Sequence, residues 1–327
     1  MQRFAVLLIL LLFSACGAVR LPAASPPSAS AEFRLWQDAA IFQPVKTLVG
    51  GARQRVLVEM YEFGRRDLAT ELEEAHARGA DVRLIFDPSV KVSAATGALL
   101  ARAGVEARPY PIDDHRHQID HVKLLLTESA AVVGGMNWGA ASSRNHDYAF
   151  ELRRAADLVR LRAVFEQDWA LAGGHPAPLT AAGPEESILQ TGAQTEVRPA
   201  LLALIRGARH EIAAEVFDLT DADVLAALAA AHRSGVRVRV LLDPNQSSNR
   251  GSYTVLKRAG VDVRWFPVHG SAKLHAKAGR FDRQLLVGSA NWTYSGLSVN
   301  HELDVRTSEA AAVAAYATRF ETDWAMS

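Results

Sequence analysis

The feature that most constrains this chain is an internal duplication with a spacing of about 155 residues. Asp87 and Asp243 are 156 residues apart, and Trp169 and Trp324 are 155 apart, so the offset is nearly constant from one end of the repeat to the other. A long repeat must be recognised before any motif is interpreted, because it decides how many folding units there are. The matched segments are VLVEMY (56–61) with IAAEVF (212–217), VRLIFDP (82–88) with VRVLLDP (238–244), and FEQDWA (165–170) with FETDWA (320–325).

Each half alternates β-branched runs with helices of apolar period, such as Leu68, Leu72 and Ala75 before a terminal Gly79. This pattern predicts an α/β fold: two homologous α/β sandwich domains, each with a central mixed β-sheet flanked by helices, related by a pseudo-twofold. A glycine- and proline-rich stretch separates the halves and cannot continue a helix. We therefore expect a first domain at 32–172, a linker at 173–186 and a second domain at 187–327.

The N-terminus has the pattern of a signal peptide at 1–15, with Arg3 before an unbroken apolar run at 4–13. That run is too short to cross a bilayer, which takes about 20 apolar residues. Small residues then precede Cys16, the only cysteine, and this arrangement resembles a bacterial lipobox. We expect lipidation at Cys16 followed by a flexible tether at 16–31, and hence an exported protein anchored in the cell envelope; ordinary secretion is the alternative.

Charge and cysteine content exclude several classes of protein. The chain has 36 basic and 36 acidic residues, so no net field draws it to a polyanion. A single cysteine rules out an internal disulfide framework and any cysteine-based zinc site.

Each half carries one short motif that can do chemistry. The motifs are His121-Val-Lys123 and His275-Ala-Lys277, and residues two apart on a strand project from one face. An acidic residue follows at the same distance in both halves, where we expect a hairpin turn, so residue 121 should lie opposite about 135 and residue 275 opposite about 289. The residues that this hairpin would gather are Glu128, Gly134, Gly135 and Asn137 in the first half, and Asp282, Gly288, Ser289 and Asn291 in the second.

These residue types suit a phosphate group. Lysine supplies a point charge, asparagine donates an amide N–H, and the glycines would let backbone N–H groups approach the oxygens. Histidine adds a nucleophile or a proton donor. Packing about a pseudo-twofold would bring both clusters to one site, where the two histidines could have different tasks.

The pattern H-x-K-x4-D, followed by G-G or G-S-x-N, resembles the signature of the phospholipase D superfamily over nearly all of the chain after residue 31. The resemblance implies a metal-independent phosphodiesterase without a cofactor, in which one histidine forms a phosphohistidine and the other protonates the leaving alkoxide. Family analogy favours His121 as the nucleophile and His275 as the acid. The implied catalytic residues are His121, Lys123, Asn137, His275, Lys277 and Asn291.

The same resemblance implies that Asp147 and Glu302 hold the two imidazoles. Glu128 and Asp282 are counted as further supporting carboxylates, although both fall at the predicted turns. Glu128 replaces the aspartate that the family prefers, and the spacing to the glycines is one residue short in both halves, which we interpret as a tighter hairpin.

Two more carboxylates lie at matched positions. Glu59 and Glu215 fall within apolar strands, where an unpaired carboxylate would be costly to bury. We therefore expect them to be partners of the site or to lie at its rim.

The motifs do not separate the substrates that this superfamily uses. The expected lipid anchor, the zero net charge and the lipid-like GGMN at 134–137 favour hydrolysis, or transphosphatidylation, of phospholipid head groups at a membrane surface. The alternatives are an exported metal-independent nuclease and a cardiolipin synthase-like phosphatidyl transferase. A protein that only binds phosphate is disfavoured, because both clusters are complete. The presence of both motifs in one chain predicts a monomer.

Overall fold

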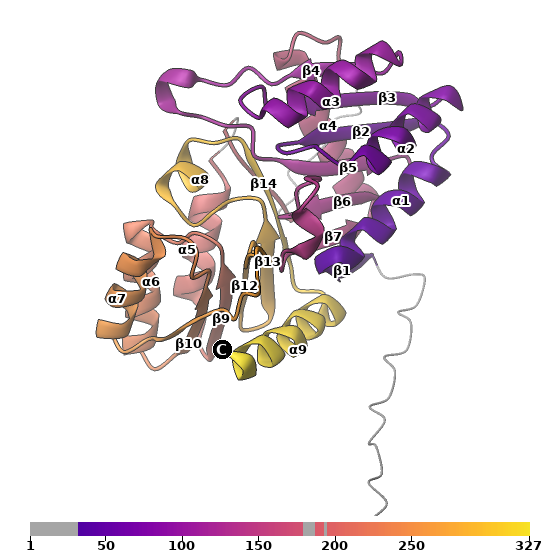
Figure 1. The fold of residues 1–327 in the computed structure, drawn as a ribbon. Coiled ribbons are helices and arrows are strands. Elements are labelled where there is room, and N and C mark those ends of the chain that lie inside the picture. Colours follow the sequence, from indigo (N-terminus) through magenta and orange to yellow (C-terminus); the bar gives the residue numbers. More distant parts are fainter. Residues whose placement is uncertain (1–31, 179–186, 193–194) are drawn as a thin grey trace, which may run out of the picture. The chain divides into compact units, whose positions relative to one another are not determined.

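Each half of the repeat builds one seven-stranded mixed sheet in the computed structural model, which describes residues 32–178, 187–192 and 195–327 (Figure 1). The predicted signal peptide, Cys16 and the tether lie outside the described residues. The strand order is β1-β7-β6-β5-β2-β3-β4 in the first sheet and β8-β14-β13-β12-β9-β10-β11 in the second, so equivalent strands occupy equivalent places. The predicted α/β fold with two mixed sheets is therefore confirmed.

The strands of the first sheet are β1 (Phe33–Gln37), β2 (Arg55–Met60), β3 (Asp81–Phe86), β4 (Glu106–Pro109), β5 (Lys123–Thr127), β6 (Ala131–Gly134) and β7 (Tyr148–Leu152). Those of the second are β8 (Ile188–Thr191), β9 (Glu211–Val216), β10 (Arg237–Leu242), β11 (Asp262–Trp265), β12 (Lys277–Phe281), β13 (Gln284–Gly288) and β14 (Glu302–Thr307). Strands β2, β3 and β4 run parallel, as do β9, β10 and β11, and the hairpins β5–β6 and β12–β13 are antiparallel.

Helices cover both sheets. They are α1 (Phe42–Gly51), α2 (Arg66–Ala77), α3 (Lys91–Arg102), α4 (Ala155–Leu171), α5 (Val197–Gly207), α6 (Ala222–Arg233), α7 (Asn249–Arg258), α8 (Tyr294–Ser298) and α9 (Ala310–Met326), with 3-10 turns at Asp38–Ile41, Asp114–Arg116 and Ser142–Arg144. Helices α2 and α6 end before Gly79 and Gly235, whose φ angles of 92° and 90° are left-handed and suit glycine. No helix within the described ranges has the length and apolarity that a membrane span requires.

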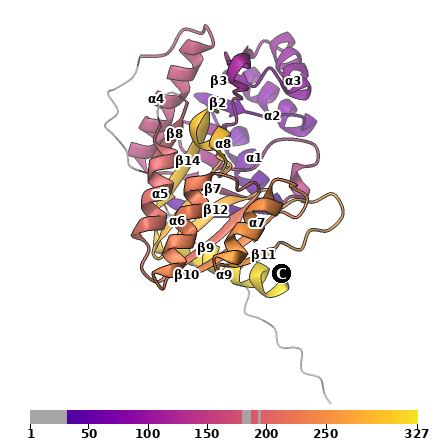
Figure 2. The same ribbon diagram turned by 90° about the vertical axis from the view of Figure 1, so that its left-hand side faces the viewer.

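The alternation of apolar side chains along the strands divides the core into layers. On β2, Val56 and Val58 pack under α1, α2 and α3, whereas Leu57 points to the opposite face of the sheet. Figures 1 and 2 show α1–α3 on the outer side of the first sheet and α5–α7 on the outer side of the second.

A shared core joins the two halves. Leu124 of the first sheet and Ala278 of the second belong to one buried cluster with Trp169 of α4 and Trp324 of α9. The described residues from Glu32 onward therefore form one compact unit in which the inner faces of both sheets meet. The domain boundaries drawn from the sequence stay a prediction, because residues 179–186 are not described.

Candidate active site

Both histidine motifs lie where a central strand begins. Lys123 opens β5 and Lys277 opens β12, and the histidines precede them by two residues. Each of these strands pairs with the first strand of its parallel trio, β2 or β9, in the middle of its sheet. All four side chains are buried, and each lysine ammonium donates to the backbone carbonyl of its own histidine.

Backbone bridges fasten each motif to the other half of the molecule. The His121 N–H donates to the His301 carbonyl at 2.8 Å, and the His301 N–H donates to the Ile119 carbonyl at 2.9 Å. In the same way the His275 N–H donates to the His146 carbonyl, and the His146 N–H donates to the Lys273 carbonyl, both at 2.8 Å. These bridges bring the two motifs into one site.

The carboxylates behind the histidines are exchanged between the halves. His121 Nδ1 lies 2.9 Å from Glu302 Oε2, and His275 Nδ1 lies 2.7 Å from Asp147 Oδ2. The two carboxylates named from the sequence are thus the ones that contact the imidazoles, but each comes from the opposite half. Among the described residues no hydrogen bond involves Nε2 of either histidine, so Nε2 is the atom that can face a substrate.

Burial and mutual repulsion depress the basicity of the whole cluster. Burial lowers the pKa of His121 to about 4, with Glu302 opposing and Lys123 adding to the effect. Burial also lowers the pKa of His275 well below its usual value, and Lys277, Lys123 and His121 contribute. The lysines respond likewise, since burial lowers the pKa of Lys123 to about 7 and that of Lys277 to about 8. The charges of each motif therefore shift the pKa values of the other motif, as expected for a single site.

The two carboxylates differ in their ionisation. Burial opposes the charge of Glu302, yet His121, Lys123 and the hydroxyl of Ser289, which donates at 2.6 Å, hold its pKa below the ordinary value. Burial raises the pKa of Asp147 to about 7, and Lys277 and the Tyr148 N–H offset this only in part. The counterpart of Ser289 beside Asp147 is Gly135, which has no side chain to donate.

The glycines are explained by close packing rather than by phosphate binding. The N–H of Gly135 donates to the Tyr148 carbonyl at 3.0 Å and that of Ser289 to the Leu303 carbonyl at 3.2 Å. A side chain on Gly135 would collide with Asp147, and one on Gly288 with Asp304. The prediction that Gly134, Gly135, Gly288 and Ser289 offer backbone N–H groups to a phosphate therefore disagrees with the geometry, because Gly134 and Gly288 are likewise paired within their sheets.

The two asparagines remain open to a ligand. Asn137 and Asn291 follow β6 and β13, and the side-chain oxygen of each is buried without a partner among the described residues. The Asn137 amide nitrogen has only a long contact, 3.4 Å, to Glu62. These oxygens are acceptors and need a donor, so it is the amide N–H groups of the same side chains that could donate to a phosphate oxygen in the site.

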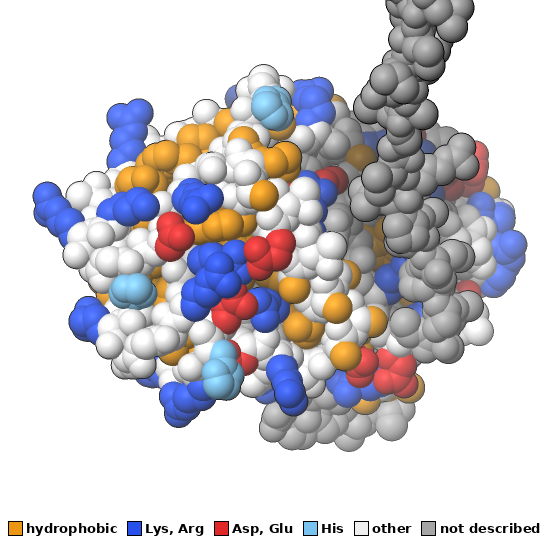
Figure 3. Space-filling view, turned by 90° about the horizontal axis from the view of Figure 1, so that it is seen from below, with side chains coloured by type: hydrophobic (Ala, Val, Ile, Leu, Met, Phe, Trp, Pro, Cys, Tyr) orange, Lys and Arg blue, Asp and Glu red, His pale blue; other side chains and the backbone are white. Residues whose placement is uncertain are grey.

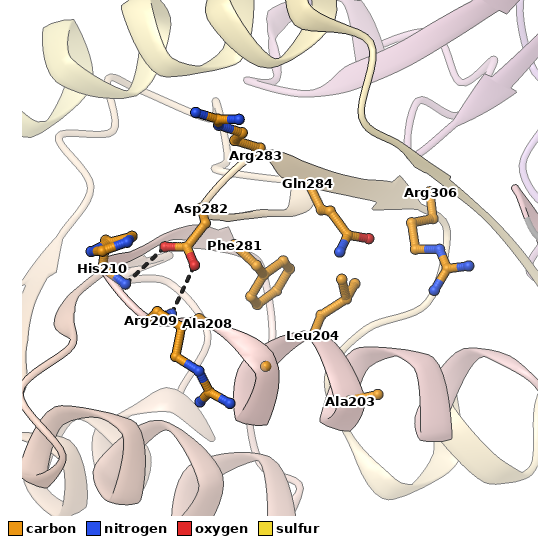
Figure 4. Close-up of a pocket in the computed structure, with 11 residues that line it drawn as sticks. Ala203, Leu204, Ala208, Arg209, His210, Phe281, Asp282, Arg283, Gln284 and Arg306 are labelled. Atoms are coloured by element: carbon orange, nitrogen blue, oxygen red, sulfur yellow. Dashed lines mark hydrogen bonds between the residues drawn. The ribbon is translucent and has the colours of Figure 1, made fainter.

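Glu128 and Asp282 do not support the histidines. The Glu128 carboxylate accepts from the Arg53 N–H at 2.8 Å, and Asp282 accepts from the Arg209 N–H at 2.7 Å and the His210 N–H at 2.9 Å (Figure 4). Both therefore tie a hairpin turn to the start of β2 or β9, at the far end of β5 or β12 from the histidine. Their assignment as supporting carboxylates is wrong, whereas their predicted place at the turns is confirmed.

A cavity beside Asp282 is separate from the motifs. It has a volume of about 450 Å³, and Figure 4 shows Phe281, Gln284 and Arg306 among its lining residues. None of its lining residues belongs to either histidine motif.

The predicted pairing register was also displaced by one residue. Leu124 pairs with Val133, which places His121 level with Met136 rather than with residue 135. Ala278 pairs with Val287 and gives the second half the same displacement. The turns are one residue longer than the predicted register assumed.

Two further clusters of buried groups lie behind the backbone bridges and could hold a metal ion. One contains Glu59, Asp168 and His301, and in each cluster the potential ligand atoms lie within 4.8 Å of one another. The other consists of His146, Glu215 and Asp323. Protein donors already serve the second cluster: the Tyr148 hydroxyl donates to Glu215 at 2.6 Å and the Arg319 guanidinium to Asp323 at 2.7 Å.

Glu59 and Glu215 were expected to be partners of the site or to lie at its rim, but they belong to these two clusters instead. Both carboxylates are fully buried, and they face His301 and His146 rather than the motif histidines. His146 and His301 are the residues whose backbones bridge the halves, so the clusters anchor the bridges. Sequence reasoning gave these histidines no role, although their matched positions in the repeat were a signal.

Comparison with known families is consistent with this geometry. A family model described as "Cardiolipin synthase, PLD-like domain" matches residues 45–169 and 201–324, once in each half. The chain therefore belongs to the phospholipase D superfamily, as the motifs indicated.

Individual relatives are similar to part of the chain. A mitochondrial cardiolipin hydrolase from Chlamydomonas reinhardtii is 32% identical over 113 residues, which is 34% of this chain and 50% of that protein. A cardiolipin synthase from Geobacillus thermodenitrificans is 26% identical over 307 residues, covering 81% of this chain and 60% of that protein. The chain thus spans between half and three fifths of the length of these relatives.

Solved structures share the fold. The phosphatidylserine synthase of Haemophilus influenzae superposes with a TM-score of 0.69 at 12% identity, covering 88% of this chain and 86% of that one. A polyphosphate kinase from Porphyromonas gingivalis gives a TM-score of 0.63 at 14% identity, over 89% of this chain and 50% of that one. Likeness at such identities concerns the fold alone.

Proposed function

We propose that this protein cleaves phospholipid phosphodiesters through a phosphohistidine on His121, with water or an alcohol as the final acceptor. The observation that carries the proposal is the difference between the two carboxylates. Glu302 is held ionised behind His121, whereas the raised pKa of Asp147, about 7, keeps a proton on the pair that it forms with His275 near neutral pH. One histidine is therefore set up as a nucleophile and the other as an acid.

In the first step His121 attacks phosphorus. Its Nδ1–H donates to Glu302, so the Nε2 lone pair is free to form the P–N bond as the bond from phosphorus to the leaving oxygen breaks. His275 gives its Nε2 proton to that oxygen, and the proton shared with Asp147 moves to Nδ1. Lys123 and Lys277, with the amides of Asn137 and Asn291, stabilise the charge on the remaining oxygens.

In the second step the roles reverse. His275 Nε2 takes a proton from water or an alcohol, whose oxygen attacks phosphorus while the P–N bond to His121 breaks. Water yields phosphatidate and alcohol yields a new phosphodiester, so the same residues serve hydrolysis and transfer. All atoms and protons balance without a metal or cofactor.

Lipid is the substrate class that the comparisons favour. Hydrolase and synthase relatives are both named for cardiolipin. A nuclease would need a continuous basic track along its groove. Figure 3 shows basic side chains scattered over the face in view, with acidic side chains beside the central group.

The test is product analysis of purified protein offered phosphatidylglycerol, phosphatidylcholine, cardiolipin and single-stranded DNA in parallel. We expect release of head group from at least one lipid, and none from any substrate with His121→Ala. Cleavage of DNA alone would replace the proposal with the nuclease alternative.

We further propose that the protein is exported and anchored through Cys16, because the only cysteine follows a signal-like apolar run. Cys16→Ser should release the protein from the membrane fraction of fractionated cells. Unchanged retention would contradict the anchor and leave the proposed chemistry untouched.

A further inference from the structure

The side of the site next to His275 has cations at two positions where the equivalent residues next to His121 are apolar. Lys273 and Arg144 are both exposed and line a cavity of about 640 Å³. In the repeat Lys273 corresponds to Ile119 and Arg144 to Val299, with the same offsets as the motif histidines and the bridging histidines. These two positions therefore depart from the pseudo-symmetry, although the side next to His121 has an exposed cation of its own, Arg116.

The cavity adjoins the histidine that we assign as the acid. Lys273 Nζ lies 5.5 Å from the centroid of the Phe217 ring, and Lys277 Nζ lies 4.9 Å from the same centroid. The centroid of the His275 ring is also 4.9 Å from that of Phe217. Lys273 and Lys277 therefore both lie near the ring of Phe217, which places the cavity beside the second motif.

The remaining charges of the cavity are paired with one another. Arg319 contacts Asp38 at 2.9 Å and Asp323 at 2.7 Å. Within the described part of the chain no ion pair involves Lys273 or Arg144, so these two cations are the ones available to an anion. The cavity also has an apolar wall, which consists of Phe266, Pro267, Val268, Ala272 and Met326.

The opposite flank is closed by a direct contact. Gln118, the counterpart of Ala272, donates its side-chain amide to the Val299 carbonyl at 2.9 Å. The small Ala272 makes no such link to Arg144. The open flank is thus the one beside His275.

We propose that this cavity binds the leaving-group side of an anionic lipid, with a second phosphate on Lys273 and Arg144 and the adjoining acyl chain along the apolar wall. The proposal rests on the proposed function, in which His275 protonates the leaving oxygen. A leaving group that carries both a phosphate and acyl chains is a phosphatidyl alcohol, so the favoured substrate class is a diphosphatidyl lipid such as cardiolipin. The apolar wall favours a lipid over a nucleic acid, whose neighbouring phosphates bring no acyl chain.

The experiment compares two lipids that differ in their leaving group. Lys273→Gln, Arg144→Gln and the double variant are assayed on cardiolipin and on phosphatidylcholine, each at a fixed low fraction in uncharged detergent micelles. The matched control is Lys257→Gln on α7, an exposed lysine of the same half whose ammonium lies 4.0 Å from Asp262. A single-stranded oligonucleotide forms a third arm.

We expect each single variant to raise KM for cardiolipin about tenfold, as for the loss of a charged hydrogen bond, while kcat changes little. The effect on phosphatidylcholine should stay below about twofold, and Lys257→Gln should match the wild type on both lipids. The double variant should lose more on cardiolipin than either single variant.

Three results would overturn the inference. Equal loss on both lipids would assign the two cations a structural role, and no loss on either would leave the cavity without a part in binding. A loss confined to the oligonucleotide would assign the second phosphate to nucleic acid. Failure of the proposed function would be seen separately, as a wild-type protein that cleaves neither lipid.

Discussion

The two pairs of histidine and carboxylate have nearly the same geometry but different chemistry. Both cross from one half to the other, with Nδ1 to oxygen distances of 2.9 Å in the His121–Glu302 pair and 2.7 Å in the His275–Asp147 pair. The side chains around them differ, because Ser289 donates to Glu302 and Gly135 has nothing to donate to Asp147. The ionised state of Glu302 is supported by His121, by Lys123 and by hydrogen bonds from Ser289 and Asn300, and of these donors the Ser289 hydroxyl has no counterpart beside Asp147.

The largest effect is expected for His121→Ala, which tests the assignment of His121 as nucleophile and His275 as acid. We expect activity on every substrate to fall by at least about 10⁴-fold, because no other group in the site has the free Nε2 lone pair and the ionised partner. Acid quench and mass spectrometry should find a phosphoryl adduct on the His121 peptide of the wild type and none in the variant. An adduct on His275 in the wild type would reverse the assignment.

His275→Ala should be less severe, and its severity should depend on the substrate. Loss of general acid catalysis costs about 10²- to 10⁴-fold on a natural lipid, and that cost should shrink for a p-nitrophenyl ester, whose leaving group needs no proton. Rates on both substrates are measured side by side. An equal loss on the two would show that His275 does not act as the acid.

Removing the Ser289 hydroxyl should reduce the difference in pKa between Glu302 and Asp147. In Ser289→Ala the pKa of Glu302 should rise, because one hydrogen bond to its anion is lost, and the acidic limb of the pH–rate profile should move to higher pH. A rise of about one unit costs about tenfold on that limb. The reciprocal Gly135→Ser is not expected to gain activity, since its side chain would collide with Asp147. An unchanged profile in Ser289→Ala would remove the hydroxyl from the explanation.

The two carboxylates should also impose opposite slopes on stability. Burial raises the pKa of Asp147 from 3.8 to about 7, so the folded state binds more protons between these values and the free energy of unfolding falls as pH rises through them. Glu302 has a lowered pKa, so its contribution is present above about 4.5 and is lost as pH falls through the lowered value. Each slope is at most about 1.4 kcal/mol per pH unit.

Urea unfolding from about pH 3 to pH 8 checks the signs. Asp147→Asn should remove the decline toward neutral pH, and Glu302→Gln should remove the loss of stability in acid. If both variants flattened the same part of the curve, the two pairs would not differ in ionisation.

The smallest expected effect is that of chelation. Because the groups placed around the phosphate are lysines and asparagines, activity should be unchanged in excess EDTA. Complete loss, restored by one divalent ion, would contradict the mechanism and direct attention to the buried clusters at His146 and His301.

The sequence predicted the repeat, the sheets and the two motifs, because these depend on local pattern and on a spacing of about 155 residues. It did not predict which imidazole each carboxylate serves, since that depends on the bridges made by His146 and His301 across a shared core. Glu128 and Asp282 were misassigned for a similar reason: a carboxylate next to a motif in sequence can lie at the far end of its strand.

Arg144 and Lys273 were also missed, because each was read within its own half. Their shared cavity brings together loops from both halves. Only the three-dimensional arrangement places these two cations in the wall of one cavity.

Because the carboxylates are exchanged between the halves, the two repeats depend on each other for function. Each half keeps a histidine whose working partner is encoded about 180 or 130 residues away, so neither half carries a complete pair of its own. Substitutions at His121 and Glu302 damage one pair, whereas substitutions at His121 and Asp147 damage two, although the second combination lies within a single half. Two halves expressed separately would therefore have to reassemble before either pair could form, and selection acts on the two repeats as one unit.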